Sequence, residues 1–153
     1  MKLQHKKLVL QQLDSTLKRF QPLKAINPPE RGWLRAIRTA LGMNGKQFAK
    51  RLGVSAPRVT YLEQDEIAGS ATIKMMQQAA RALNCKFVYG IVPQKSLFDI
   101  IKKQAIDVAK NRIARTSHTM LLEKQELTIN DQKKILKNMI VDITETLPKS
   151  LWD

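Results

Sequence analysis

The sequence predicts a mainly α-helical protein with one short β-strand. Apolar residues recur at intervals of three and four over most of the 153-residue chain, which is the spacing of one buried helix face. Capping residues, glycines and prolines separate these stretches, as expected at helix ends. A single stretch after residue 85 is instead rich in β-branched and aromatic residues. We therefore expect a helical bundle with an N-terminal helix, one short strand and a C-terminal helical extension.

Residues 1–27 form the first expected segment, an amphipathic helix over residues 2–20 followed by a linker. The apolar side of this helix has the spacing of a short heptad seam, which Lys6 interrupts. We expect the helix to pack on the rest of the chain or on a second subunit. Prolines at 22, 28 and 29 end it and form the linker.

Two flanking helices are expected around the centre of the chain. The first covers residues 33–41, follows Pro28 and Pro29, and ends at Gly42. The second covers residues 73–83 and is capped by Ser70 or Thr72. Both have apolar stripes at helical spacing.

Between them, residues 44–53 predict a short helix followed by a sharp turn. Asn44 can cap the helix because its side chain accepts an otherwise unpaired backbone N–H group. Phe48, Ala49 and Leu52 fall on one side and form one buried face. Gly53 suits the turn because glycine takes a positive φ at little cost.

A second short helix is predicted to begin directly after this turn. Ser55 is placed to cap it, and Pro57 lies in the first turn, where a missing N–H does no harm. Val59 and Leu62 are expected to face inward. The outward side chains are then Arg58, Thr60 and Tyr61. This is a helix-turn-helix, a device that places side chains in the DNA major groove; an ordinary corner between two helices is the alternative for the bare pattern.

Together with the flanking helices, this pair forms a self-sufficient domain, which we place at residues 28–85.

Residues 86–153 form the third segment. Its strand runs through Phe87, Val88, Tyr89, Ile91 and Val92. Because a strand needs a partner, we expect pairing with a second copy across a two-fold axis; an extended connector lying on the core is the alternative.

Two long helices complete the third segment. One is expected over residues 96–123, beginning at Ser96, and the other over residues 130–147. Asn130 and Asp131 are the expected caps of the second, and Pro148 stops it. This segment is the expected dimerisation region of a homodimer.

The charge of the chain is strongly positive. It carries 27 Lys and Arg against 13 Asp and Glu, a net charge of +14. The electrostatic field of such a charge attracts polyanions. Basic surfaces also occur on membrane-surface proteins, however. The sequence contains no run of about 18 apolar residues that would predict a transmembrane helix. It also shows no signal-peptide pattern. A cytoplasmic, nucleoid-associated protein is expected, with its single cysteine, Cys85, buried at a helix end.

Residues 33–83 resemble the Cro/repressor, or xenobiotic-response-element (XRE), type of helix-turn-helix class, which implies a lambda-repressor-like bundle. Leu52-Gly-Val-Ser and Leu62-Glu63 stand where that class has them. A narrower resemblance is to the bacterial family named mobile mystery protein A. It rests on four segments: Arg31-Gly-Trp-Leu-Arg-Ala-Ile-Arg, Arg51-Leu-Gly-Val-Ser-Ala-Pro-Arg-Val, Arg81-Ala-Leu-Asn-Cys-Lys-Phe-Val-Tyr and His118-Thr-Met-Leu-Leu-Glu-Lys-Gln.

The class resemblance implies which residues meet DNA. Base edges would be met by the start of the second helix, at Ala56, Pro57, Arg58 and Tyr61, with Thr60 nearer the backbone. Arg58 is the expected reader of guanine, because its planar fork matches O6 and N7. Phosphate contacts are implied for Asn44, Lys46, Gln47 and the N–H groups after Ser55. Arg38 is implied to pair with Glu63 and to face a phosphate.

One position departs from the class. Gly45 stands where the class usually has a glutamine that braces the second helix and a phosphate, so that contact is in doubt and Gln47 is the candidate substitute. For Lys46, Gln47 and Lys50, a solvated helix face is the alternative to DNA contact.

No catalytic, metal-binding or cofactor-binding pattern is present. His5 and His118 are far apart in sequence and lack metal-ligand spacing, and no glycine-rich phosphate loop occurs. We therefore expect a DNA-binding repressor of its own operon, with no cofactor. The alternative is an antitoxin that inhibits a Fic-domain enzyme, a partner that the narrower resemblance implies. Thr119 and Glu123, spaced as in inhibitory helices of Fic enzymes, would then be the contact residues.

Overall fold

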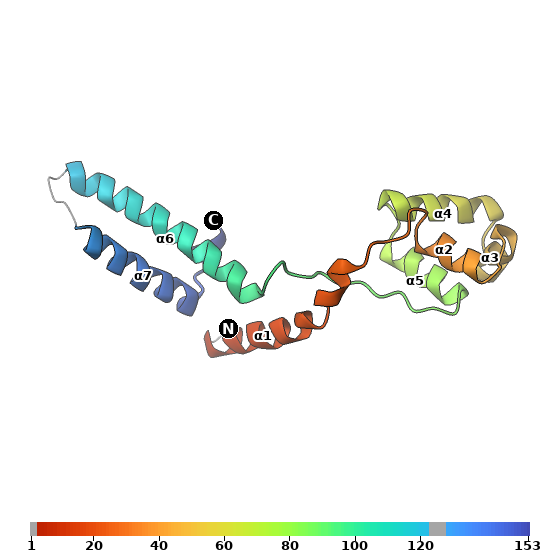
Figure 1. Ribbon diagram of the computed structural model, residues 1–153, viewed down its shortest axis with the longest axis horizontal. Coiled ribbons are helices and arrows are strands. Elements are labelled where there is room, and N and C mark those ends of the chain that lie inside the picture. The colour runs from red at the N-terminus through yellow and green to blue at the C-terminus, as the bar shows by residue number, and fades with distance from the viewer. Residues whose placement is uncertain (1–2, 123–127) are drawn as a thin grey trace. The chain divides into compact units, whose positions relative to one another are not determined.

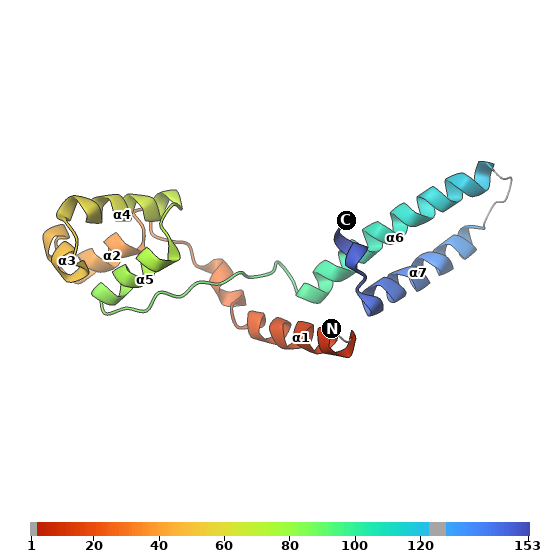
Figure 2. The same cartoon turned by 180° about the vertical axis from the view of Figure 1, so that it is seen from behind.

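The computed structural model describes residues 3–122 and 128–153, which divide into two compact units. One unit comprises residues 22–90, and the other comprises residues 1–21 together with 91–153. Both are helical (Figures 1 and 2). The described part of the chain contains no helix long and apolar enough to cross a membrane.

The unit of residues 22–90 is a bundle of four short helices. They are α2 (Trp33–Ala40), α3 (Gly45–Leu52), α4 (Ala56–Ala68) and α5 (Ile73–Ala82), and the short 3-10 helix η1 (Gln21–Ala25) precedes them. Helix α3 packs against α4 and α5, and α2 packs against α4. The shared core consists of Leu34, Phe48, Ala49, Val59, Leu62, Met76, Ala79 and Leu83. All four predicted helices of this region are therefore present.

The caps of these helices follow the sequence closely. Asn44 caps α3, and Gly53 ends it in the left-handed region with φ 75°. Thr72, rather than Ser70, caps α5 by accepting the Met75 N–H. Ser55 occupies the N-cap position of α4 without a side-chain hydrogen bond. The backbone N–H groups in the first turn of α4 therefore do not donate to the Ser55 side chain.

The second unit contains α1 (Leu3–Lys18), α6 (Leu97–Leu122), α7 (Ile129–Thr146) and the 3-10 helix η2 (Lys149–Trp152). Helices α6 and α7 form an antiparallel hairpin (Figure 2), whose core cluster consists of Ala105, Ala109, Ile143 and Leu151. Helix α1 packs on α6. The Asp14 carboxylate accepts the N–H groups of Leu97 and Phe98 at 2.7 and 3.2 Å. A carboxylate at a helix N-terminus is favourable because it satisfies unpaired donors and opposes the helix dipole.

Three sequence-based expectations for residues 85–131 are wrong. The predicted strand is absent: in the described part of the chain residues 86–95 form neither helix nor strand. This stretch has high strand propensity, but the described residues contain no second strand, and propensity alone does not hold an isolated strand together. Cys85 is exposed rather than buried. The cap of α7 is Thr128, which accepts the Asp131 N–H, rather than Asn130 or Asp131.

Candidate nucleic-acid interface

Local hydrogen bonds build the turn between α3 and α4. Asn44 and Gln47 form a reciprocal capping box: the Gln47 N–H donates to Asn44 Oδ1 at 2.9 Å, and the Asn44 N–H donates to Gln47 Oε1 at 2.8 Å. At the other end of α3, the Val54 N–H donates to the Ala49 carbonyl at 3.0 Å. Pro57 lies in the first turn of α4, where it needs no hydrogen-bond acceptor. The predicted helix-turn-helix is thus stabilised by hydrogen bonds and by a proline that lie within a few residues of the turn.

Helix α4 presents a polar face to solvent. Val59 and Leu62 are each 1% exposed, so they anchor the helix in the core. Arg58, Thr60 and Tyr61 are exposed, as predicted, and Tyr61 has 59% of its surface accessible. A rigid helix that holds exposed polar and aromatic side chains is suited to base-edge contacts.

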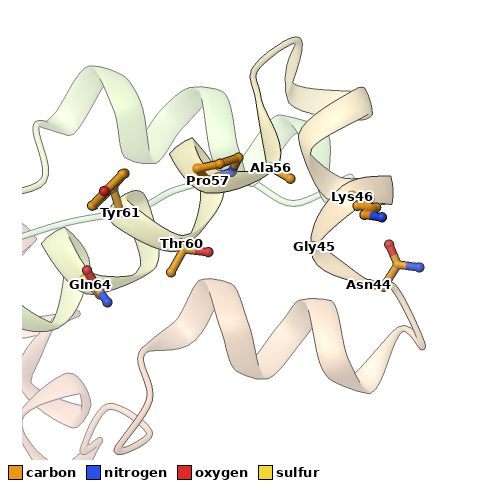
Figure 3. Close-up of a pocket in the computed structure, with 8 residues that line it drawn as sticks. All are labelled: Asn44, Gly45, Lys46, Ala56, Pro57, Thr60, Tyr61 and Gln64. Atoms are coloured by element: carbon orange, nitrogen blue, oxygen red, sulfur yellow. The ribbon is translucent and has the colours of Figure 1, made fainter.

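An open groove of about 840 Å³ lies between this face of α4 and the start of α3. Figure 3 shows its eight lining residues: Asn44, Gly45, Lys46, Ala56, Pro57, Thr60, Tyr61 and Gln64. Six of them are predicted DNA-binding residues. Arg58 and Ser55 are exposed on or beside α4 but do not line the groove.

Gln64 is a groove residue that sequence reasoning missed. It lies one helical turn beyond Thr60, and residues at i and i+4 share a helix face, so this spacing was the available signal. A glutamine amide can pair in a bidentate way with N6 and N7 of adenine. Gln64 therefore joins Tyr61 as a candidate for base contact.

The substitution of Gln47 for a side chain at position 45 stays a prediction. The side-chain carbonyl oxygen of Gln47 is engaged in the capping box with Asn44. Gln47 also lines a different hollow, of about 410 Å³, together with Lys50 and Arg51. At Gly45 itself, a Cβ atom would have no heavy atom within 4 Å, so a longer side chain fits there.

A mostly buried ion pair holds α4 against α2. Arg38 Nε and Nη2 donate to Glu63 Oε1 and Oε2 at 2.7 and 3.2 Å, which confirms the predicted pair. Arg38 Nη1 donates to the Met43 carbonyl at 3.0 Å, just before α3 begins. Each guanidinium nitrogen therefore has an intramolecular acceptor, and one side chain ties together α2, α4 and the approach to α3. The implied contact between Arg38 and phosphate stays a prediction.

The N-terminus of α2 is capped by the far end of α4. Gly32, at the N-cap position, has no side chain to supply a cap. The Glu66 carboxylate accepts the N–H groups of Trp33 and Leu34 at 2.7 and 3.0 Å instead. Gly32 has φ 76°, and a Cβ there would lie 2.7 Å from Glu66 Oε2. A glycine at position 32 therefore lets the carboxylate approach.

We expect Glu66→Ala to lower the free energy of unfolding by about 1 kcal/mol, the usual effect of losing a helix cap. Two N–H groups of α2 would lose their acceptor, and the helix dipole would lose a nearby negative charge. Chemical denaturation of the full chain measures the change. Glu30→Ala, at an exposed glutamate, is the control. Equal stability of both variants and the unaltered protein would contradict this role.

The residues of the antitoxin alternative gain no support from the structure. Thr119 is exposed, and its hydroxyl donates to the Arg115 carbonyl at 3.1 Å within α6. Glu123 lies outside the described residues.

Comparison with known families identifies the same region. Residues 34–89, somewhat more than a third of the chain, match a helix-turn-helix family model. The match runs from α2 through α5 and supports a DNA-binding regulator of the XRE type. No curated protein and no solved structure matches the chain. The narrower resemblance to mobile mystery protein A stays a prediction.

Proposed function

From a helix-turn-helix at residues 34–89, we propose that the protein is a sequence-specific regulator of transcription that binds double-stranded DNA and represses its own operon. The observation that carries the proposal is the outward face of α4, held rigidly by the core and by the Arg38–Glu63 pair beside an open groove. A net charge of +14 attracts the DNA backbone. The protein acts in this proposal by occupying its site, without a catalytic step.

Footprinting on DNA from upstream of the protein's own gene tests the proposal. We expect a protected site at nanomolar protein and a reporter behind that DNA to be silenced. A scrambled duplex of the same composition should show no protection under the same salt. Equal protection of both duplexes would contradict sequence-specific binding.

The proposed active form is a homodimer. A single recognition helix reads one half-site, and two-fold related copies read a palindrome. The unit that contains the hairpin of α6 and α7 supports this proposal, because its core cluster has only four buried residues among those described, two of them alanines. Apolar side chains of the same unit remain exposed, among them Leu8, Val9, Leu13, Ile100, Ile135 and Val141. Light scattering should give twice the 17.5 kDa chain mass, whereas a mass of one chain at micromolar concentration would contradict the dimer.

Lys46 is expected to contact phosphate rather than bases, because it sits at the start of α3 on the edge of the groove. We predict that Lys46→Ala weakens binding to every duplex by a similar factor. The slope of log affinity against log salt should fall by about one for each bound subunit. Salt titrations by fluorescence anisotropy measure both effects. Lys137→Ala, at an exposed lysine of α7, should leave the slope unchanged; a sequence-dependent loss in Lys46→Ala would contradict the assignment.

Gly45→Gln should bind DNA more tightly than the unaltered protein, by about fivefold for one added hydrogen bond to phosphate. The position has room for the side chain, and its φ needs no glycine. Gly45→Ala is the matched control because it makes the same change to the backbone without supplying the amide. Anisotropy on one operator duplex measures both variants. Equal affinity of the Gln and Ala variants would mean that position 45 does not face a phosphate.

A further inference from the structure

A second cavity, of about 500 Å³, lies within the unit of residues 22–90. Residues of helices α2 and α5 and of chain segments 23–28 and 85–88 line it. It shares no lining residue with the groove beside α4. Its volume falls in the range of small-molecule sites, about 300–1,000 Å³. The DNA-binding proposal gives this cavity no role.

The wall of this cavity is apolar and partly open to water. Trp33 and Ile37 of α2 and Met76 and Ala80 of α5 line it. Several lining side chains are strongly exposed: Leu23 43%, Ile26 53%, Trp33 45% and Val88 68%. Covering such surface releases water and is favourable in proportion to the apolar area buried. The wall therefore favours a ligand with an apolar body.

A smaller hollow of about 290 Å³ adjoins this cavity. The two share Cys85, Lys86 and Phe87, and the smaller one adds Gln77 and Arg81 of α5. Lys86 thus lines the apolar cavity, and Arg81 lines the hollow that adjoins it. Neither lining contains an aspartate or a glutamate. A ligand here would meet apolar side chains along its body and positive charge at one end.

We propose that the two adjoining cavities together bind a small amphipathic anion, an aliphatic or aromatic carboxylate. Its apolar body lies between α2 and α5, beside Trp33. Its carboxylate lies between Arg81 and Lys86, where a guanidinium can bind both oxygens. Charge selects the class of ligand: an amine of the same length would bring a cation toward two cations.

Trp33 reports directly on occupancy. The chain has two tryptophans, and Trp152, in the other unit, is exposed and replaceable by phenylalanine. In the full-length Trp152→Phe protein, hexanoate, octanoate and decanoate should shift Trp33 emission to the blue and shield it from iodide. Affinity should rise about threefold to fourfold for each added methylene until the cavity is filled. Octylamine should bind about tenfold more weakly than octanoate.

Two sets of variants locate the site. Arg81→Gln and Lys86→Gln should each weaken octanoate about twofold to fivefold, as expected for partly exposed ion pairs, while octanol binds as before. Ile26→Asp, which brings a negative charge to the wall, should weaken octanoate more than Ile26→Asn does. Circular dichroism checks that each variant is folded.

The proposal would be overturned by affinity that does not depend on chain length, by equal binding of octanoate and octylamine, or by no response of Trp33. Shielding of Trp33 that grows with protein concentration in the absence of ligand would also overturn it, because a second copy would then cover the cavity. No step of the titration uses DNA. Failure here is therefore separate from failure of the DNA-binding proposal.

Discussion

Glu63→Ala should lower the free energy of unfolding by about 3 kcal/mol, the expected effect of removing one partner of a buried ion pair. Glu63 is 6% exposed, and both of its carboxylate oxygens accept hydrogen bonds from Arg38. The Arg38 side chain is only 14% exposed, so its charge would stay largely out of water without a counterion. Urea denaturation monitored by Trp33 fluorescence in the Trp152→Phe background follows this unit.

The double variant Arg38→Met with Glu63→Leu separates two explanations of that loss. An apolar pair of similar size often restores most of the stability, because neither charge is then desolvated. We expect the double variant to be at least about 1 kcal/mol more stable than Glu63→Ala. A change below about 0.5 kcal/mol in Glu63→Ala, the usual range of surface substitutions, would contradict a structural role for the pair.

Arg58→Ala should weaken binding to the preferred DNA site about tenfold to a hundredfold, the usual loss for one bidentate contact to guanine. Binding to unrelated duplexes should fall much less, because it depends on phosphate contacts. Anisotropy titrations on both duplexes give the specificity ratio. Arg58 is exposed on α4 next to the turn, so its loss should leave the fold intact.

Arg58→Lys is the matched control for charge. Lysine keeps the positive charge but lacks the planar fork, so non-specific affinity should be retained while the specificity ratio falls. An unchanged ratio in both variants would move base reading from Arg58 to the groove residues Tyr61 and Gln64.

The helix-turn-helix was predictable because its signals are local. Asn44, Gly53 and Pro57 act within a few residues of their own positions, and each appears where the sequence predicts it. The inward positions of Val59 and Leu62 follow from helical spacing in the same way. The Arg38–Glu63 pair spans 25 residues and was predicted only through the class resemblance.

Contacts between distant segments were not predictable from spacing. Glu66 caps α2 across 32 residues, and Asp14 caps α6 across 83. Nothing in the sequence distinguishes the carboxylates of Glu66 and Asp14 from those of ordinary solvent-exposed acidic residues. The predicted strand failed for a related reason, since strand propensity describes the residues and not the partner that they need. Gln64 lies one helical turn beyond Thr60, outside the positions that the class resemblance implicates.

Selection from a random pool of duplexes by the full-length protein, at physiological salt, tests the central claim most directly. We predict enrichment of one palindromic motif, with half-site centres one helical turn of DNA, about 10 base pairs, or a multiple of it apart. The Arg58→Ala protein should enrich a motif that is degenerate at one position in each half-site. A pool that stays random after repeated selection, although the protein retains DNA in every round, would contradict sequence-specific recognition by α4.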